Sequence, residues 1–158
     1  MNDSIETQLA ENGFYVSTTV GVSMRPMLRN RRDRVILRPV GEERLCKWDL
    51  PLYRRPDGKY VLHRIIGVED GYYIIRGDNT YVKEKVPDAW IIGVVSEFYR
   101  GDRHVTADNK GYRRYAAFWH AIYPIRKPLY HARLFAARVK NKLCREIRKL
   151  FPRKKEQA

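Results

Sequence analysis

The first hundred residues alternate short runs of β-branched and aromatic residues with turn-forming clusters, and this pattern strongly limits the folds open to the chain. Turn clusters at 56–58 and 69–71, each ending in glycine, separate neighbouring runs. Short strands at this spacing predict a compact, mainly β domain with antiparallel strands over about 14–100. The strands are expected in the runs 14–20, 35–37, 59–62, 64–68, 72–75 and 90–95. A short helix is expected before them, from Ile5 to Glu11.

Charge is distributed unevenly along the 158 residues. Residues 110–158 contain 15 lysines and arginines against two glutamates, whereas residues 1–109 contain 17 basic and 16 acidic residues. The net charge of +14 therefore lies almost wholly in the last third of the chain. The polar stretch 101–111 is expected to be a loop. We therefore expect a β domain over 1–108, followed by a basic amphipathic helical tail over 109–158.

The tail has a helical pattern. Pro124 and Pro128 are expected to separate an aromatic helix around 112–123 from a later basic helix. In the later helix, apolar residues recur every three or four positions, at 132, 135, 136, 139, 143, 147 and 150. A basic amphipathic helix can bind peripherally to an anionic membrane, here through 126–155. Nucleic acid or an acidic protein is the alternative partner, and the apolar stripe could instead pack back on the β domain.

Targeting and metal-binding signals are not expected in this chain. Its N-terminus has no positively charged segment followed by an apolar run, which argues against a secretory signal. The most apolar tail stretch, 115–125, is shorter than the roughly 20 residues that a membrane-spanning helix needs. Cys46 and Cys144 lack metal-ligand spacing, so we expect no disulfide framework, metal or cofactor. These features favour a cytoplasmic protein that is at most peripheral on a membrane.

Two segments contain a candidate nucleophile and its base. Ser23 follows an expected strand and precedes Pro26, which interrupts regular backbone pairing and favours a bend that exposes the hydroxyl. Serine needs a base within hydrogen-bond reach, and His63 lies in an otherwise apolar strand. Histidine is mostly neutral at pH 7, whereas deprotonating a lysine would cost roughly 4–5 kcal/mol. The sequence therefore favours a Ser23–His63 pair.

A third segment, Gly77-Asp78-Asn79, supplies a candidate carboxylate. A carboxylate hydrogen-bonded to the second ring nitrogen orients a catalytic imidazole and stabilises its protonated form. Asp78 is the first candidate for this role, and Glu84 is the second. Read alone, the Gly-Asp-Asn segment is typical of a turn.

Taken in order, these segments resemble the conserved boxes of the signal-peptidase and LexA-like serine peptidases. The match comprises the Gly-x-Ser-Met-x-Pro box at 21–26, an Asp-x-Val box at 33–35, the His-Arg box at 63–64 and the Gly-Asp-Asn box at 77–79. A histidine in the second box is similar to the endoplasmic-reticulum and archaeal signal peptidases, since the bacterial enzymes use lysine. The resemblance implies a serine endopeptidase that cleaves a leader or signal-like peptide after small residues, with Met24 lining the pocket for the residue before the scissile bond.

The sequence departs from that pattern at three points. Arg32 stands where the family has glycine, and no stretch of this sequence is expected to serve as the family's membrane anchor. The acidic pair that follows the last box in the endoplasmic-reticulum type is replaced by Thr-Tyr-Val-Lys-Glu at 80–84. The third catalytic member is therefore Asp78, Glu84 or neither. Alternative functions are a LexA-like regulatory module that binds nucleic acid through residues 110–158, and an interaction module without catalytic activity.

Overall fold

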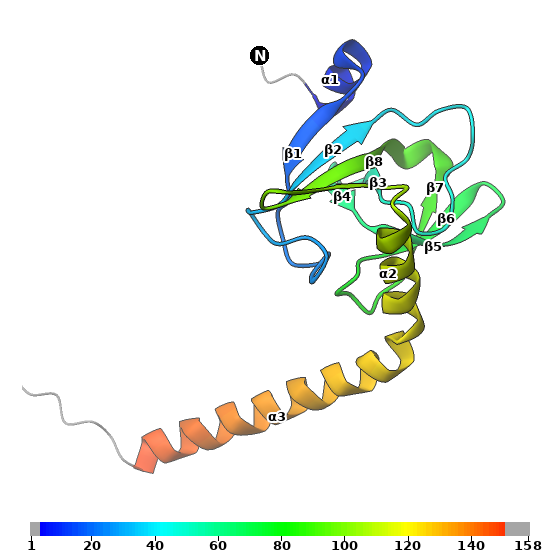
Figure 1. The fold of residues 1–158 in the computed structure, drawn as a ribbon. Coiled ribbons are helices and arrows are strands. Elements are labelled where there is room, and N and C mark those ends of the chain that lie inside the picture. Colours follow the sequence, from blue (N-terminus) through cyan, green and yellow to red (C-terminus); the bar gives the residue numbers. More distant parts are fainter. Residues whose placement is uncertain (1–3, 151–158) are drawn as a thin grey trace, which may run out of the picture. The chain divides into compact units, whose positions relative to one another are not determined.

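The structure is a computed structural model that describes residues 4–150, apart from the side chains of 134, 143, 144 and 146–150 (Figure 1). It is mainly antiparallel β with C-terminal helices, as the sequence predicts. The first unit ends at His120 and the second begins at Ala121. The helices are α1 (Ile5–Asn12), α2 (Lys110–Ala121) and α3 (Tyr123–Leu150), with a 3-10 turn at Asp88–Trp90. The strands are β1 (Tyr15–Thr18), β2 (Arg34–Arg38), β3 (Pro51–Arg54), β4 (Tyr60–Leu62), β5 (Arg64–Glu69), β6 (Tyr72–Arg76), β7 (Glu84–Pro87), β8 (Ile91–Arg100) and β9 (Arg103–Thr106).

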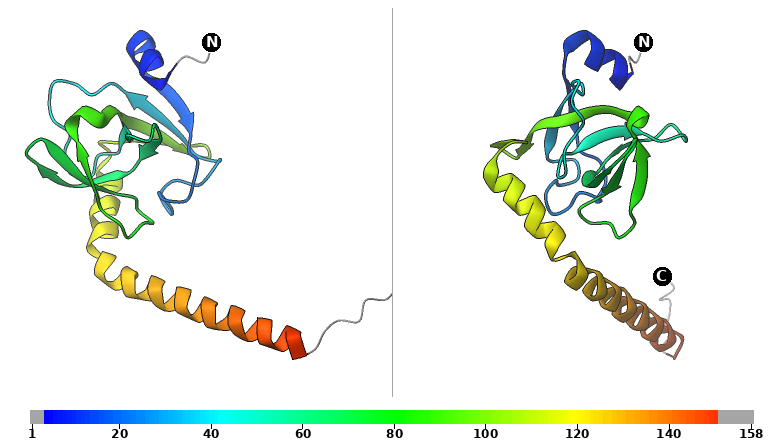
Figure 2. Two further views of the ribbon diagram at one scale, coloured as in Figure 1. Left: turned by 180° about the vertical axis from the view of Figure 1, so that it is seen from behind. Right: turned by 90° about the vertical axis from the view of Figure 1, so that its right-hand side faces the viewer.

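The strands form two antiparallel sheets. One has the order β1-β2-β8-β3-β4, with β9 also paired to β8, and the other has the order β5-β6-β7. Figure 2 shows that the larger sheet curls. The chain leaves it at the end of β4 and enters the smaller sheet at β5, with only His63 between the two strands. His63 thus lies at the junction of the sheets, a position fixed by the backbone on both sides.

Two clusters of buried apolar side chains stabilise the two sheets. The larger contains Met24, Met27 and Leu28 from the loop after β1, together with strand residues and Tyr112 of α2. The smaller lies within and beside the second sheet and is built from Tyr53, Ile65, Tyr73, Ile75 and Val86. Because the loop that contains Ser23 sends three side chains into the larger cluster, burial of apolar surface fixes that loop.

The expected N-terminal helix is confirmed. The Ser4 side chain accepts a hydrogen bond from the Thr7 backbone N–H, and Gly13 ends the helix at a φ of 72°. An N-cap hydroxyl and a left-handed glycine are the usual partners of unpaired groups at helix ends. Leu9, on the inner side, packs in the larger cluster.

Several expectations for the second half of the chain need correction. The loop expected at 101–111 contains β9, which pairs with β8 as a hairpin turning at Gly101, where φ is 63°. Pro128 does not break the helix: it lies inside α3, while Pro124 occupies its first turn, where no backbone donor is needed. The first unit extends to His120 and so includes nearly all of α2. The stripe positions 143, 147 and 150, and residues 151–155, lie outside the described side chains.

Candidate active site

Ser23 lies in the loop between β1 and β2, which is fixed by hydrogen bonds at its base. Asp33 is fully buried and accepts from the Arg29 backbone N–H at 2.7 Å and from its guanidinium at 2.9 Å. The Thr19 hydroxyl lies within hydrogen-bonding distance of the carbonyl oxygens of Arg29 and Asp33, at 3.1 and 3.2 Å. Burial opposes ionisation of Asp33, but the bonds from Arg29 bring its pKa below the ordinary value. The Asp-x-Val box therefore closes the loop that presents Ser23.

The Gly-Asp-Asn box contacts the Ser23 loop directly. The Asn79 backbone N–H donates to the Ser23 carbonyl oxygen at 2.7 Å, and the Asn79 side-chain amide donates to the Val22 carbonyl at 3.2 Å. A Cβ added at Gly77 would lie 2.8 Å from the same Ser23 oxygen and 3.0 Å from His63 Nε2. Only glycine leaves room for this approach, so the box brings the serine and the histidine to one point.

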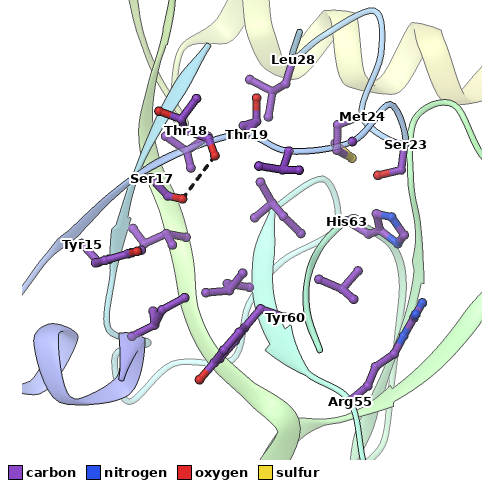
Figure 3. A pocket seen from close by; sticks show the side chains of 18 residues that line it. Tyr15, Ser17, Thr18, Thr19, Ser23, Met24, Leu28, Arg55, Tyr60 and His63 are labelled. Atoms are coloured by element: carbon purple, nitrogen blue, oxygen red, sulfur yellow. Dashed lines mark hydrogen bonds between the residues drawn. The ribbon is translucent and has the colours of Figure 1, made fainter. Parts of the chain in front are cut away.

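His63 is almost fully buried, with 8% of its surface exposed. Burial lowers the pKa of the His63 imidazole, and this effect outweighs the opposing influence of the Glu84 charge. Figure 3 shows the Ser23 hydroxyl and the His63 ring beside one another at one side of a pocket. The two residues singled out as nucleophile and base thus lie together, with the imidazole biased toward its neutral form.

Glu84 lies on the other side of the imidazole. Its Oε1 is 3.4 Å from His63 Nδ1, and the buried Tyr53 hydroxyl is also 3.4 Å from that nitrogen. Glu84 Oε2 accepts a bond from Arg55 Nε at 2.9 Å. Burial alone would raise the pKa of Glu84, but the bonds from Arg55 and Tyr53 hold it below the ordinary value. Glu84 is therefore ionised at neutral pH and placed to orient the ring.

Asp78, the first candidate for that role, is paired with Arg64. Its two carboxylate oxygens accept from Arg64 Nε and Nη2, both at 2.8 Å, and both residues are buried. Arg64 also donates to the Tyr112 hydroxyl at 2.8 Å, and Trp119 Nε1 of α2 donates to the Asp78 backbone carbonyl at 2.9 Å. Asp78 thus joins the His-Arg box to the Gly-Asp-Asn box and to α2.

A pocket of about 420 Å³ opens beside Ser23 and His63 (Figure 3). Its walls include both ends of the curled sheet, β1 and β4. Its apolar lining consists largely of buried side chains, including Met24, Leu28, Val35, Leu37 and Leu52. Met24 therefore belongs to both the core and the pocket wall, whereas Met27 lies wholly in the core, with its sulfur 2.8 Å from Arg64 Nη2.

Sequence reasoning missed four residues around this site. Tyr53 and Arg55 flank Glu84, and Tyr112 and Trp119 reach the Arg64–Asp78 pair from α2. The aromatic residues repeat at helical spacing in 112–119, which predicts a buried helix face but not its partner. Arg55 had no distinguishing signal, because exposed and paired arginines look alike in sequence.

No group of metal-ligating side chains occurs among the residues that the structure describes. No protein-family model matches the sequence, and no curated protein matches it.

Proposed function

We propose that this chain is a serine endopeptidase in which Ser23 is the nucleophile, His63 the general base and Glu84 the carboxylate that orients the imidazole. The position of Gly77 carries the proposal: one point beside its Cα is 2.8 Å from the Ser23 carbonyl and 3.0 Å from His63 Nε2. Residues forty positions apart in sequence meet there, next to a pocket. Figure 3 shows the Ser23 hydroxyl beside the His63 ring, and a serine nucleophile needs such a base within hydrogen-bond reach.

The surroundings of His63 support its role as a base. A neutral imidazole carries one proton, and a carboxylate beside Nδ1 holds the proton on that nitrogen. Glu84 is 3.4 Å from Nδ1, and this leaves Nε2, on the Gly77 side, as the proton acceptor. Since burial lowers the pKa of His63, the neutral acceptor form predominates at pH 7.

The proposed reaction follows the general scheme for acyl transfer. Ser23 Oγ transfers its proton to His63 Nε2 and bonds to the substrate carbonyl carbon, whose π electrons move onto oxygen. The Ser23 backbone N–H is the proposed donor to that oxyanion. Collapse breaks the peptide C–N bond as the imidazolium protonates the leaving amine. Water, deprotonated by the same imidazole, then hydrolyses the acyl-enzyme.

The pocket suggests how a substrate binds. Edge strands β1 and β4 both line it, and an extended peptide can pair with such edges through its backbone. The apolar floor formed by Leu28, Val35 and Leu37 favours an uncharged side chain near the cleavage point. A leader or signal-like peptide bound in extended form fits this arrangement.

Labelling with a fluorophosphonate probe, followed by peptide mapping, tests the proposal. We expect modification at Ser23, complete loss in Ser23→Ala, and a decrease of about 10²-fold or more in His63→Ala. Ser17→Ala is the matched control, because Ser17 lines the same pocket and should leave labelling unchanged. Undiminished labelling in Ser23→Ala contradicts the assignment. Salt-dependent nucleic-acid binding without any labelling would instead support the regulatory module.

A further inference from the structure

Helix α3 exposes an apolar stripe along one side. Ile125, Leu129 and Val139 have 65%, 58% and 50% of their surface exposed. With Ala132 and Ala136 they fall within an arc of about 80° at 3.6 residues per turn. A continuous exposed stripe on a helix of 28 residues marks a surface that binds another apolar phase.

Basic side chains are frequent outside the stripe. No acidic residue occurs between 123 and 145, while six exposed lysines and arginines do: Lys127, Arg133, Arg138, Lys140, Lys142 and Arg145. Lys140 and Arg133 flank the stripe on one side, and Phe135, which is 70% exposed, borders it on the other. The partner must therefore offer an apolar layer next to a dense negative charge.

Three partner classes fit these requirements unequally. Nucleic acid would neutralise the cations but leave the apolar stripe in water. A second copy of the helix would cover the stripe but bring two rows of like charge together. An anionic lipid bilayer matches both features, because acyl chains take up the stripe and lipid phosphates and carboxylates lie at the height of the flanking cations.

We propose that α3 binds in the plane of an anionic lipid bilayer, with Ile125, Leu129 and Val139 inserted and the flanking lysines and arginines at the headgroups. None of the described helices is long and apolar enough to cross a membrane, which fits a helix lying along the surface. This inference concerns α3 alone and does not depend on catalysis at Ser23.

Sedimentation of the full chain with lipid vesicles tests the proposal. Vesicles of phosphatidylcholine with about one third phosphatidylserine should bind the chain at least tenfold more tightly than phosphatidylcholine alone, and added salt should weaken that binding. The double variant Leu129→Glu/Val139→Glu should lose at least about tenfold in affinity. The matched control Ala137→Glu/Asn141→Glu adds the same charge on the polar side and should lose less than about threefold.

Several outcomes would overturn the proposal. They are equal binding to neutral and anionic vesicles, equal losses in the two double variants, and no vesicle binding together with duplex DNA binding or self-association. Circular dichroism checks that both variants keep the helix. The lipid and salt dependence of the unmodified chain decides the question if either variant is misfolded. Fluorophosphonate labelling in solution reports separately on the proposed peptidase.

Discussion

At the scale of single residues, two carboxylates near His63 have different partners and different effects. Glu84 shares its oxygens between Arg55 and the imidazole, whereas Asp78 is paired with the buried Arg64. Glu84 is partly exposed, so the imidazole beside it can change between its neutral and its protonated form. Asp78 and Arg64 are both buried, and loss of either charge would leave the other buried without a partner. Glu84 therefore suits a reaction in which His63 gains and loses a proton.

The first prediction concerns pH. Only neutral His63 can accept the Ser23 proton, and burial lowers the pKa of His63. Because a lowered pKa keeps the imidazole neutral further into acid, the labelling rate should fall with an apparent pKa below about 6.5. The rate of fluorophosphonate labelling between about pH 4.5 and 8 measures it. If the labelling rate fell to half its plateau at a pH above about 6.5, the assigned environment of the His63 ring would be wrong.

The second prediction separates the two carboxylates. Glu84→Gln removes the charge that orients the ring, so labelling should slow by about 10²–10⁴-fold with the fold retained. It also removes a charge that raises the pKa of His63, so the acid limb should move to lower pH. Asp78→Asn leaves Arg64 buried without its counter-charge and should cost about 3–5 kcal/mol in the free energy of unfolding.

Labelling kinetics and denaturant unfolding, measured on both variants, provide the comparison. If Asp78→Asn keeps native stability but loses labelling, while Glu84→Gln labels normally, Asp78 takes the role of the orienting carboxylate instead.

At the scale of elements, the turn between β6 and β7 joins the serine loop to the histidine. Gly77→Ala would bring a methyl group within 2.8 Å of the Ser23 carbonyl and 3.0 Å of the imidazole. Neither neighbour is the flexible end of a long side chain, so the turn, the Ser23 backbone or the His63 ring must shift, and the geometry of the pair changes. We expect labelling to fall at least about 10²-fold, the contribution typical of a positioned base.

Gly41→Ala, in the segment between β2 and β3, is the control for the same substitution, because a Cβ there meets nothing within 4 Å. Both variants should unfold cooperatively in a thermal melt. Labelling of Gly77→Ala at the unmodified rate would mean that the turn does not hold the pair together.

Strands formed by runs of β-branched and aromatic residues could be predicted from the sequence, and strands of mixed or polar composition could not. Runs such as 72–75 became β6, but β3 begins at a proline, β7 contains Glu84 and Lys85, and β9 is polar. Their pairing with neighbouring strands, rather than their own propensity, makes them strands. Likewise Ser23 and His63 stood out by residue type and context, whereas the partner of His63 Nδ1 depends on where β7 pairs, which no local pattern records.

At the scale of the whole molecule, the charge asymmetry and the division into units do not coincide. The basic region starts at residue 110, but α2 belongs with the strands. Its side chains bond the first unit: Tyr112 accepts from the buried Arg64, and Trp119 donates to the Asp78 carbonyl. The partly exposed Arg113 donates to Asp49 at 2.6 Å. Helix α2 therefore supports the candidate active site through Arg64 and Asp78. Only the residues from Ala121 onward form the separate basic unit.

Two truncated variants test this division. A chain ending at Ala121 keeps α2 and every described contact around Ser23 and His63, so it should melt within about 4 °C of the full chain and label at a similar rate. A chain ending at Asn109 loses the Tyr112 and Trp119 bonds and exposes Phe98, which packs on Tyr112 with ring centroids 5.1 Å apart. Since buried polar groups left unpaired cost about 1–3 kcal/mol each, this shorter chain should lose both labelling and cooperative unfolding. If the chain ending at Asn109 retained both, α2 would not support the site. If the chain ending at Ala121 lost labelling, support would have to come from residues after α2.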